Sequence, residues 1–121
     1  MNSSDLLAPA ARLLVSRGVP APMRAALAER YGCADADGFD WSSCNEIELL
    51  VTTATDGADE KLMSALPRLR AVCSLGVGVD ALDIAAAERL GVAVSNTPDV
   101  LNDCVADLAI GLVIDVSRGL S

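Results

Sequence analysis

The residues with the clearest capacity for chemistry lie in the stretch CSLGVGVDALD, from Cys73 to Asp83. Its central part, residues 76–81, reads GVGVDA and fits the G-x-G-x-x-[G/A] pattern, in which a glycine turn brings backbone N–H groups close to the phosphates of a dinucleotide. Because the pattern is short and its residue types are common, it leaves two uses open. The turn could bind a dinucleotide, or its glycines could serve backbone geometry alone.

The sequence around this turn argues against a dinucleotide. In dinucleotide folds the helix starts within the glycine turn, so that its N-terminal N–H groups face the pyrophosphate. Here Asp80 and Asp83 would place two carboxylates beside that pyrophosphate, and Asp83 is expected to cap the following helix instead. The acidic residue expected about 20 positions further on is also missing, because the next strand ends in Ser95 and Asn96.

Charge and composition exclude several classes of protein. The 121 residues carry a net charge of −8, and their nine Lys and Arg residues form no cluster. Because a nucleic-acid backbone is followed by a basic stripe, we expect no nucleic-acid partner. The N-terminus has Asp5 where a signal peptide would be positive, and no stretch reaches membrane-spanning length. We therefore expect a single folded cytoplasmic domain without a membrane partner.

Histidine is absent from the chain, and cysteine is sparse. Without histidine there is no imidazole general base, no Ser-His-Asp triad and no imidazole metal site. The cysteines form no C-x-x-C pair, so we expect no metal ligands, and we expect the thiols to be small buried apolar groups. These cysteines are Cys33, Cys44, Cys73 and Cys104.

Strand and helix patterns alternate along the chain. This alternation predicts an α/β protein with a parallel sheet covered on both faces, the flavodoxin-like form of the doubly wound fold. In such sheets ligands meet the loops at the carboxyl ends of the strands, where the GVGV turn and the TTATDG loop, residues 52–57, are expected. The predicted strands are 11–16, a short strand near Cys33, 46–55, 70–75 and 92–96, and the predicted helices are 20–32, 58–67 and 83–90.

Residues 99–121 differ in character and predict one helix of about five turns, with Asp99 as its cap. Its polar residues fall near one side and apolar residues cover most of the rest. Such a helix is normally buried on most sides, so we expect one face against its own sheet and the remainder against another partner. We therefore divide the chain into a domain, residues 1–98, and a connecting helix, residues 99–121, whose sequence looks truncated. A homodimer contact is expected from Val100 to Leu120.

The longest recognisable pattern is GVGVDALDIAAA...GVAVSNTPDVL...VADLAIGL, within residues 66–112. It resembles the amino-terminal substrate-binding domain of the D-2-hydroxyacid dehydrogenases, in particular the branch of glyoxylate and hydroxypyruvate reductases. The earlier run LLVTTATDGADEKLMSALP fits the strand, loop and helix of that family, and the first 45 residues match in element order only. The resemblance implies that a second, Rossmann domain, absent from this chain, carries NAD or NADP and the catalytic arginine, glutamate and histidine.

The resemblance also implies an anion site at the GVGV turn. The backbone N–H groups of Val77 and Gly78 would hold the carboxylate of a small 2-oxo acid, and Gly76 would belong to the same site. Consecutive amides in a tight turn form an anion-binding concavity, and the missing Cβ of glycine lets a backbone approach closely. Further family positions that border the substrate correspond to Ala54, Thr55 and Leu101.

Two functions compete on these grounds. In the first, the chain is the substrate-binding domain of an NAD(P)-dependent D-2-hydroxyacid dehydrogenase that reduces small 2-oxo acids. The chain would then have no catalytic or cofactor-binding residue of its own and no activity alone. The alternative is a free-standing, non-catalytic flavodoxin-like module that binds a small anion or a protein partner. A flavodoxin or a phosphoacceptor receiver fits less well, because the chain has three aromatic residues and no Ser/Thr-rich phosphate loop after its first strand.

Overall fold

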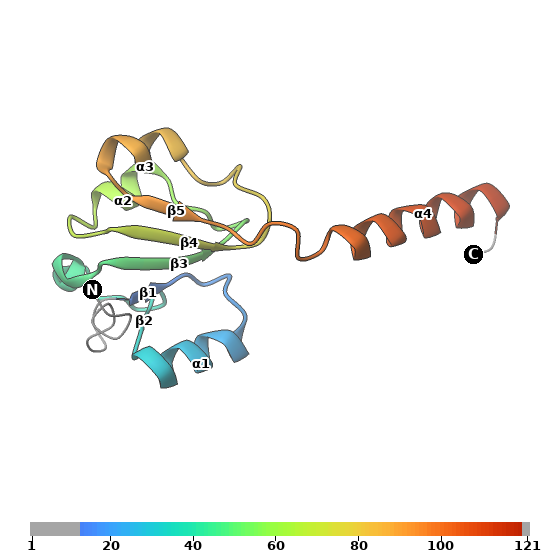
Figure 1. Cartoon of the computed structure of the whole chain (residues 1–121). Coiled ribbons are helices and arrows are strands. Elements are labelled where there is room, and N and C mark those ends of the chain that lie inside the picture. The colour runs from blue at the N-terminus through green and yellow to red at the C-terminus, as the bar shows by residue number, and fades with distance from the viewer. Residues whose placement is uncertain (1–12, 120–121) are drawn as a thin grey trace.

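Five parallel strands form the centre of the protein, whose residues 13–119 are described by a computed structural model (Figure 1). The strand order β2-β1-β3-β4-β5 is that of the flavodoxin-like doubly wound fold, which confirms the predicted fold class. Residues 11 and 12 of the first predicted strand lie outside the described residues. The strands are β1 (Leu13–Val15), β2 (Ala34–Asp35), β3 (Leu49–Thr53), β4 (Ala71–Leu75) and β5 (Ala93–Ser95); the helices are α1 (Ala21–Tyr31), α2 (Glu60–Ser64), α3 (Ile84–Leu90) and α4 (Asn102–Arg118), with a 3-10 helix η1 (Trp41–Glu46).

The main core lies on the face of the sheet that α2 and α3 cover. Leu14, Leu50 and Val72 occupy matching positions on β1, β3 and β4, so their side chains point to the same face. They pack with Met63 of α2 and Ala86 of α3, and all five side chains are buried. Burial of a Leu, Val or Met side chain contributes about 1.5–3 kcal/mol, so this layer is a principal source of stability for the sheet.

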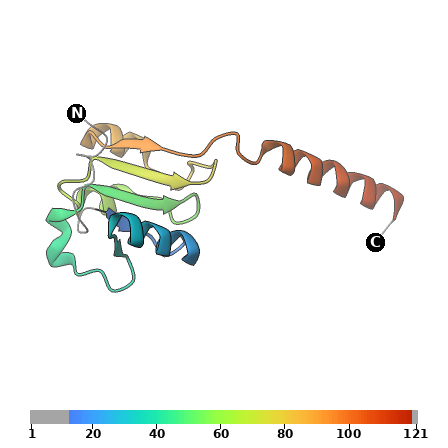
Figure 2. The ribbon, with the colours of Figure 1, turned by 60° about the horizontal axis from the view of Figure 1, so that its bottom comes forward.

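A helix covers only part of the opposite face of the sheet. Val15 of β1 is fully buried against a second cluster that includes Leu27 of α1. Along the same register, however, Val51 is half-buried, and Cys73 and Ser95 are exposed. Figure 2 shows α1 in front of the β1 side of the sheet, whereas no helix lies in front of β4 and β5. The prediction of a sheet covered on both faces therefore holds in part within the described residues.

Local capping explains where the short helices begin. The Asp83 carboxylate accepts a hydrogen bond from the Ala86 N–H at 2.9 Å, which confirms the predicted cap of α3. Sequence reasoning missed η1, which lies between the short strand near Cys33 and β3. The Asp40 carboxylate precedes it and accepts hydrogen bonds from the N–H and the hydroxyl of Ser42.

The last helix differs from the prediction at its start and in its packing. Asp99 is not its cap: this residue has a φ of +63° and its carboxylate accepts a hydrogen bond from the Asn102 side chain, while Leu101 occupies the N-cap position. α4 projects from the carboxyl edge of the sheet (Figure 1), and apart from Asp115 its side chains are exposed. The expected contact between α4 and its own sheet is therefore wrong. No helix within residues 13–119 is long and apolar enough to span a membrane.

The cysteines also differ from expectation. Cys33 and Cys44 are half-buried, and Cys73 and Cys104 are exposed, so the prediction of four buried thiols is wrong. The reason lies in the packing of their elements, because Cys73 is on the uncovered part of the sheet face and Cys104 is on α4.

Candidate functional site at the carboxyl edge of the sheet

Three loops meet where β3, β4 and β5 end. The Ala54 N–H, directly after β3, donates a hydrogen bond to the Leu75 carbonyl at the end of β4, at 3.2 Å. The Thr97 N–H, after β5, donates to the carbonyl of Gly76 at 3.0 Å. Because the strands are parallel, their carboxyl ends share one edge, and these bonds hold the loops together there.

Gly76 is the fixed point of the GVGV turn. Its N–H donates to the Thr97 hydroxyl at 2.9 Å, so this amide has a protein partner already. Its φ is +133°, a backbone conformation that residues other than glycine rarely adopt. A Cβ added here would lie 2.9 Å from the Cβ of Ala54, closer than side chains normally approach. Gly76 therefore shapes the turn, and its N–H is committed to Thr97.

The next two residues present the groups that the sequence predicts for anion binding. The N–H groups of Val77 and Gly78 have no hydrogen-bond acceptor among residues 13–119, and both residues are exposed. The Val77 carbonyl is held by the side-chain amide of Asn96 at 2.9 Å. A Cβ on Gly78 would lie 3.7 Å from that of Ala54, an ordinary contact distance. The turn thus carries two adjacent donors without an acceptor among residues 13–119, on a backbone held by its neighbours.

Asn96 and Thr97 were missed as site residues by the sequence reasoning. They follow β5 directly, and β5 pairs with β4, so their side chains reach the turn that follows β4. The sequence carried a usable signal in the adjacent polar residues of SNTP, immediately after an apolar strand.

Asp56 holds the loop that contains Ala54 and Thr55. Its carboxylate accepts hydrogen bonds from the Ser16 hydroxyl and the Gly18 N–H, each at 2.6 Å, and so joins the loops after β3 and β1. These bonds, that of Ser16 first, lower the pKa of Asp56 below its usual value. Thr55 is exposed, whereas Ala54 lies against the turn.

The geometry of the turn does not fit a dinucleotide. α3 begins only at Ile84, after Asp83 has capped it, so the GVGVDA residues do not open into a helix whose N–H groups could face a pyrophosphate. Asp80 is exposed in the same loop, where its carboxylate would repel a phosphate. The dinucleotide interpretation of residues 76–81 is therefore not supported.

An apolar hollow adjoins the turn. It has a volume of about 550 Å³ and lies between the turn and the first two turns of α4. Leu101, predicted from the family pattern, faces this hollow together with Val77, so the structure brings the two residues to one place. The lining residues are Val77, Leu101, Asn102, Val105, Ala106 and Ala109.

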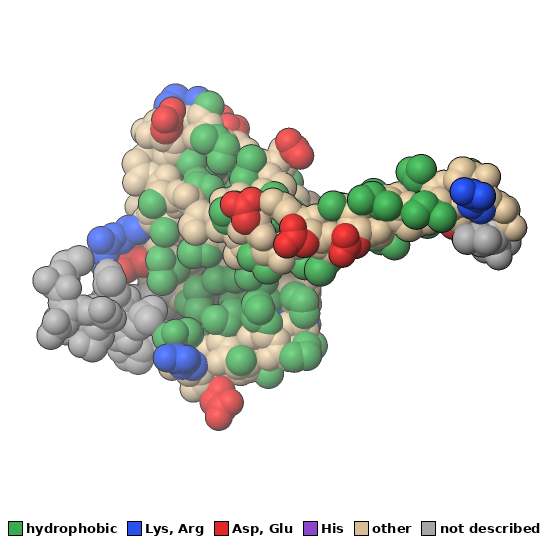
Figure 3. All heavy atoms as spheres, turned by 45° about the vertical axis from the view of Figure 1, so that its right-hand side comes forward, with side chains coloured by type: hydrophobic (Ala, Val, Ile, Leu, Met, Phe, Trp, Pro, Cys, Tyr) green, Lys and Arg blue, Asp and Glu red, His purple; other side chains and the backbone are tan. Residues whose placement is uncertain are grey.

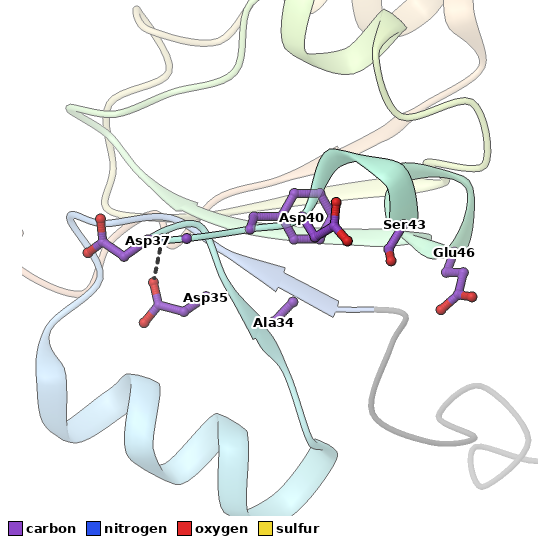
Figure 4. Close-up of a pocket in the computed structure, with 8 residues that line it drawn as sticks. Ala34, Asp35, Asp37, Asp40, Ser43 and Glu46 are labelled. Atoms are coloured by element: carbon purple, nitrogen blue, oxygen red, sulfur yellow. Dashed lines mark hydrogen bonds between the residues drawn. The ribbon is translucent and has the colours of Figure 1, made fainter.

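A second hollow, of about 380 Å³, lies between β2 and η1 (Figure 4). Its lining includes four carboxylates, and several of these have partners: Arg24 pairs with Asp35 at 2.9 Å, and Arg17 pairs with Asp37. Surplus negative charge makes this hollow unsuited to an anion. No group of three Cys, Asp or Glu side chains within the described part of the chain is placed to hold a metal ion.

The chain is similar to known proteins over the part that contains the turn. The sequence profile described as the catalytic domain of D-isomer specific 2-hydroxyacid dehydrogenase matches residues 41–112, more than half of the chain. A hydroxyphenylpyruvate reductase of Plectranthus scutellarioides is 51% identical over 72 residues, which are 60% of this chain and 23% of that protein.

Solved structures give the same result. A 2-hydroxyacid dehydrogenase of Ketogulonicigenium vulgare superposes with a TM-score of 0.84 at 30% identity, over 93% of this chain and 37% of that one. An NADPH-dependent glyoxylate/hydroxypyruvate reductase of Sinorhizobium meliloti, solved with NADP and malonate, gives a TM-score of 0.73 at 30% identity, over 86% of this chain and 33% of that one. The matched parts thus span between 23% and 37% of these relatives' own lengths.

Proposed function

Because the chain belongs to the family of D-isomer specific 2-hydroxyacid dehydrogenases, we propose that it is the substrate-binding domain of an NAD(P)-dependent enzyme that reduces small 2-oxo acids such as glyoxylate or hydroxypyruvate. The role of the domain is to hold the substrate carboxylate on the N–H groups of Val77 and Gly78. Ala54, Thr55 and Leu101 border the remainder of the substrate.

One observation carries this proposal: two adjacent amide N–H groups without an acceptor among the described residues lie at the carboxyl edge of a doubly wound sheet. Ligands of such folds bind at that edge. Hydrogen bonds to a charged acceptor contribute about 1.5–3 kcal/mol each, so two of them anchor a carboxylate without a basic side chain. The hydrogen bonds to Asn96 and Thr97 hold the turn in place, so less of the backbone has to become ordered when a ligand binds.

The cofactor belongs elsewhere in this proposal. The turn at residues 76–81 does not fit a pyrophosphate, so we assign NAD or NADP to a second domain of the parent enzyme. The nicotinamide supplies the hydride, whereas this domain fixes the position of the acid that receives it. The chain alone is expected to bind neither NADH nor NADPH and to turn over no 2-oxo acid.

Titration of the chain with pyruvate, followed by ¹H–¹⁵N correlation spectra, tests the carboxylate site. We expect saturable shifts of the Val77 and Gly78 amide signals in the millimolar range, since about −4 kcal/mol corresponds to a Kd near 1 mM. Methyl pyruvate, which has a similar shape but no charge, is the control ligand. It should leave both signals unmoved at equal concentration.

A matched pair of variants locates the binding. Gly78→Val puts a branched side chain over the two amides and should abolish the saturable shifts, whereas Gly111→Val, at an open position on α4, should preserve them. Equal responses to pyruvate and methyl pyruvate, or shifts that survive Gly78→Val, would contradict the carboxylate role.

The surface of α4 supports a further part of the proposal, a homodimer that uses the segment from Val100 onward. Leu108, Val113 and Val116 are 64%, 68% and 81% exposed. Large exposed apolar side chains gathered on one element are typical of protein interfaces. A two-fold axis is the simplest symmetry for such a contact.

A further inference from the structure

Asn96 contacts the GVGV turn from the β5 side. It follows β5 directly and is half-buried, and its side-chain nitrogen donates a hydrogen bond to the Val77 carbonyl at 2.9 Å. Because a carbonyl only accepts hydrogen bonds, the NH₂ group of Asn96, and not its oxygen, must face Val77. The bond therefore depends on the amide of Asn96, and a carboxylate of the same shape could not make it.

The peptide groups before Val77 follow the ordinary strand pattern. In a strand the C=O groups of successive residues point alternately to the two neighbouring strands. The Leu75 carbonyl accepts a hydrogen bond from the Ala54 N–H, on the β3 side. The Gly76 carbonyl accepts one from the Thr97 N–H, on the β5 side. Continued by one residue, the pattern would turn the Val77 carbonyl back to the β3 side.

Asn96 interrupts this alternation. Its bond holds the Val77 carbonyl on the β5 side, the same side as the Gly76 carbonyl. No cis peptide bond occurs within residues 13–119, so the N–H of each peptide group points opposite to its C=O. The N–H groups of Val77 and Gly78 belong to these two peptide groups, and both therefore point to the β3 side.

Two successive donors that face one side are what a small anion requires. They form the concavity typical of anion binding, which the alternating N–H groups of a regular strand do not provide. The loop after β3 lies on the same side, because a Cβ on Gly78 would be 3.7 Å from the Cβ of Ala54. A carboxylate on the two donors would thus lie between the turn and the loop that contains Ala54 and Thr55.

Side chains give this place little attraction for an anion. On the face of the described residues that Figure 3 shows, Asp and Glu side chains, and no Lys or Arg side chain, lie where α4 leaves the domain. The backbone donors must then supply the attraction, so their direction decides whether a carboxylate binds. A hydrogen bond to a peptide C=O also polarises the N–H of the same group, so Asn96 strengthens the Gly78 donor as well as turning it.

We propose that Asn96 is a positioning residue of the carboxylate site: its side-chain amide turns the Val77–Gly78 peptide group so that the Gly78 N–H faces the ligand beside the Val77 N–H. This inference rests on the proposed function and adds to it the residue that brings the two donors together. Thr97 has a different part. Its bonds to Gly76 continue the pattern of the sheet and fix the direction of the Val77 N–H alone.

Pyruvate titrations of Asn96→Ala, followed by ¹H–¹⁵N correlation spectra of the full chain, test this role. Without the bond, the Val77 carbonyl returns to the strand pattern and the Gly78 N–H turns away from the ligand. We expect the dissociation constant for pyruvate to rise by about 10- to 150-fold, as for the loss of one hydrogen bond to a charged acceptor. The remaining pyruvate-dependent shift should persist at Val77 and be lost at Gly78.

The matched control is Asn45→Ala. Asn45 is exposed on η1, which precedes β3 and so lies at the opposite edge of the sheet from the turn. This variant should change neither the dissociation constant nor the shifts at Val77 and Gly78.

A second variant, Asn96→Asp, removes the donor and keeps the size of the side chain, so its effect does not depend on a gap left by alanine. It should give the same selective loss at Gly78, with a larger rise in the dissociation constant because the new carboxylate also repels pyruvate. Asn45→Asp controls for the added charge. Unchanged amide signals of the core residues Leu14 and Leu50 show that a variant is folded.

The outcomes separate this inference from the proposed function. Saturable shifts in the wild-type chain, with the same shifts and dissociation constant in Asn96→Ala, would overturn the positioning role and retain the carboxylate site. Equal weakening of the shifts at Val77 and Gly78 in a folded variant would overturn it as well, because Asn96 would then stabilise the turn as a whole. Failure of both variants to fold would assign Asn96 to the fold and likewise overturn its positioning role. A wild-type chain without saturable shifts overturns both the inference and the proposed function.

Discussion

Replacement of Gly76 by alanine tests whether the GVGV turn is as constrained as its geometry indicates. Two separate costs apply. The φ of +133° is a conformation that costs a side-chain-bearing residue about 1–3 kcal/mol. The new Cβ would also meet the Ala54 Cβ at 2.9 Å, and overpacking of this kind costs about 1–3 kcal/mol.

Gly76→Ala should therefore lower the free energy of unfolding by about 2–6 kcal/mol, a large part of the 5–15 kcal/mol typical of a domain. Gly78→Ala is the matched control, since its Cβ would lie 3.7 Å from Ala54 and its φ is not left-handed. Its effect should stay below about 1 kcal/mol. Urea unfolding followed by circular dichroism measures both, and with an m value of about 1–3 kcal/mol/M the midpoints should differ by at least about 0.3 M.

The double variant Ala54→Gly, Gly76→Ala separates the two costs. Removal of the Ala54 methyl relieves the steric contact but not the backbone strain, so a coupling energy of about 1–3 kcal/mol should appear in a double-mutant cycle. Equal, small effects of Gly76→Ala and Gly78→Ala would refute the reasoning. That outcome would mean that the backbone of the turn is easily deformed, and such a turn would bind a carboxylate weakly.

Three further predictions concern the same edge of the sheet. The pKa of Asp56 is lowered in the folded chain, so its contribution to stability is present above the ordinary pKa of 3.8 and is lost as the pH falls from 3.8 through the lowered folded value; urea midpoints from pH 5 to pH 2 should fall less steeply in Asp56→Asn. Thr97→Val leaves the Gly76 N–H without its protein acceptor and should cost about 0.5–1.5 kcal/mol in urea unfolding, because water can reach this exposed bond, whereas Thr97→Ser should retain most of the stability. NADH fluorescence should not change when the chain is added, and saturable quenching would revive a dinucleotide site at residues 76–81.

The order of elements was predictable because each one has a local signal. Alternating apolar runs and helical patterns gave every strand and helix of the described domain except η1, and the position of Asp83 alone was enough to predict it as a cap. The bounds were less accurate: the strand predicted at 46–55 is Leu49–Thr53. Ile47 and Thr55 in its flanks are β-branched, but β1 and β4 pair with no residue of this segment outside Leu49–Thr53.

The predictions that failed depend on contacts between distant parts of the chain. The composition of α4 indicates that it is buried, but composition does not say against which surface, and within the described residues α4 packs on none. Asp99 has the right type and position for a cap, yet its left-handed backbone turns its carboxylate to the side chain of Asn102. Cys73 was expected to be a small buried apolar group, but it lies on an inner strand that no described helix covers on that face.

The GVGVDA pattern shows why a glycine motif needs its surroundings before it predicts a ligand. The residue types of the pattern fit a dinucleotide turn as well as they fit a turn that binds a small anion. The residues immediately after the turn distinguish the two. Where a helix begins within the turn, its unpaired N–H groups point at a phosphate. Here Asp83 delays the helix and satisfies its first donors, so the donors left to a ligand are those of Val77 and Gly78 in the turn itself. Two amides match the two oxygens of a carboxylate, which supports the proposal of a small 2-oxo acid over that of a nucleotide.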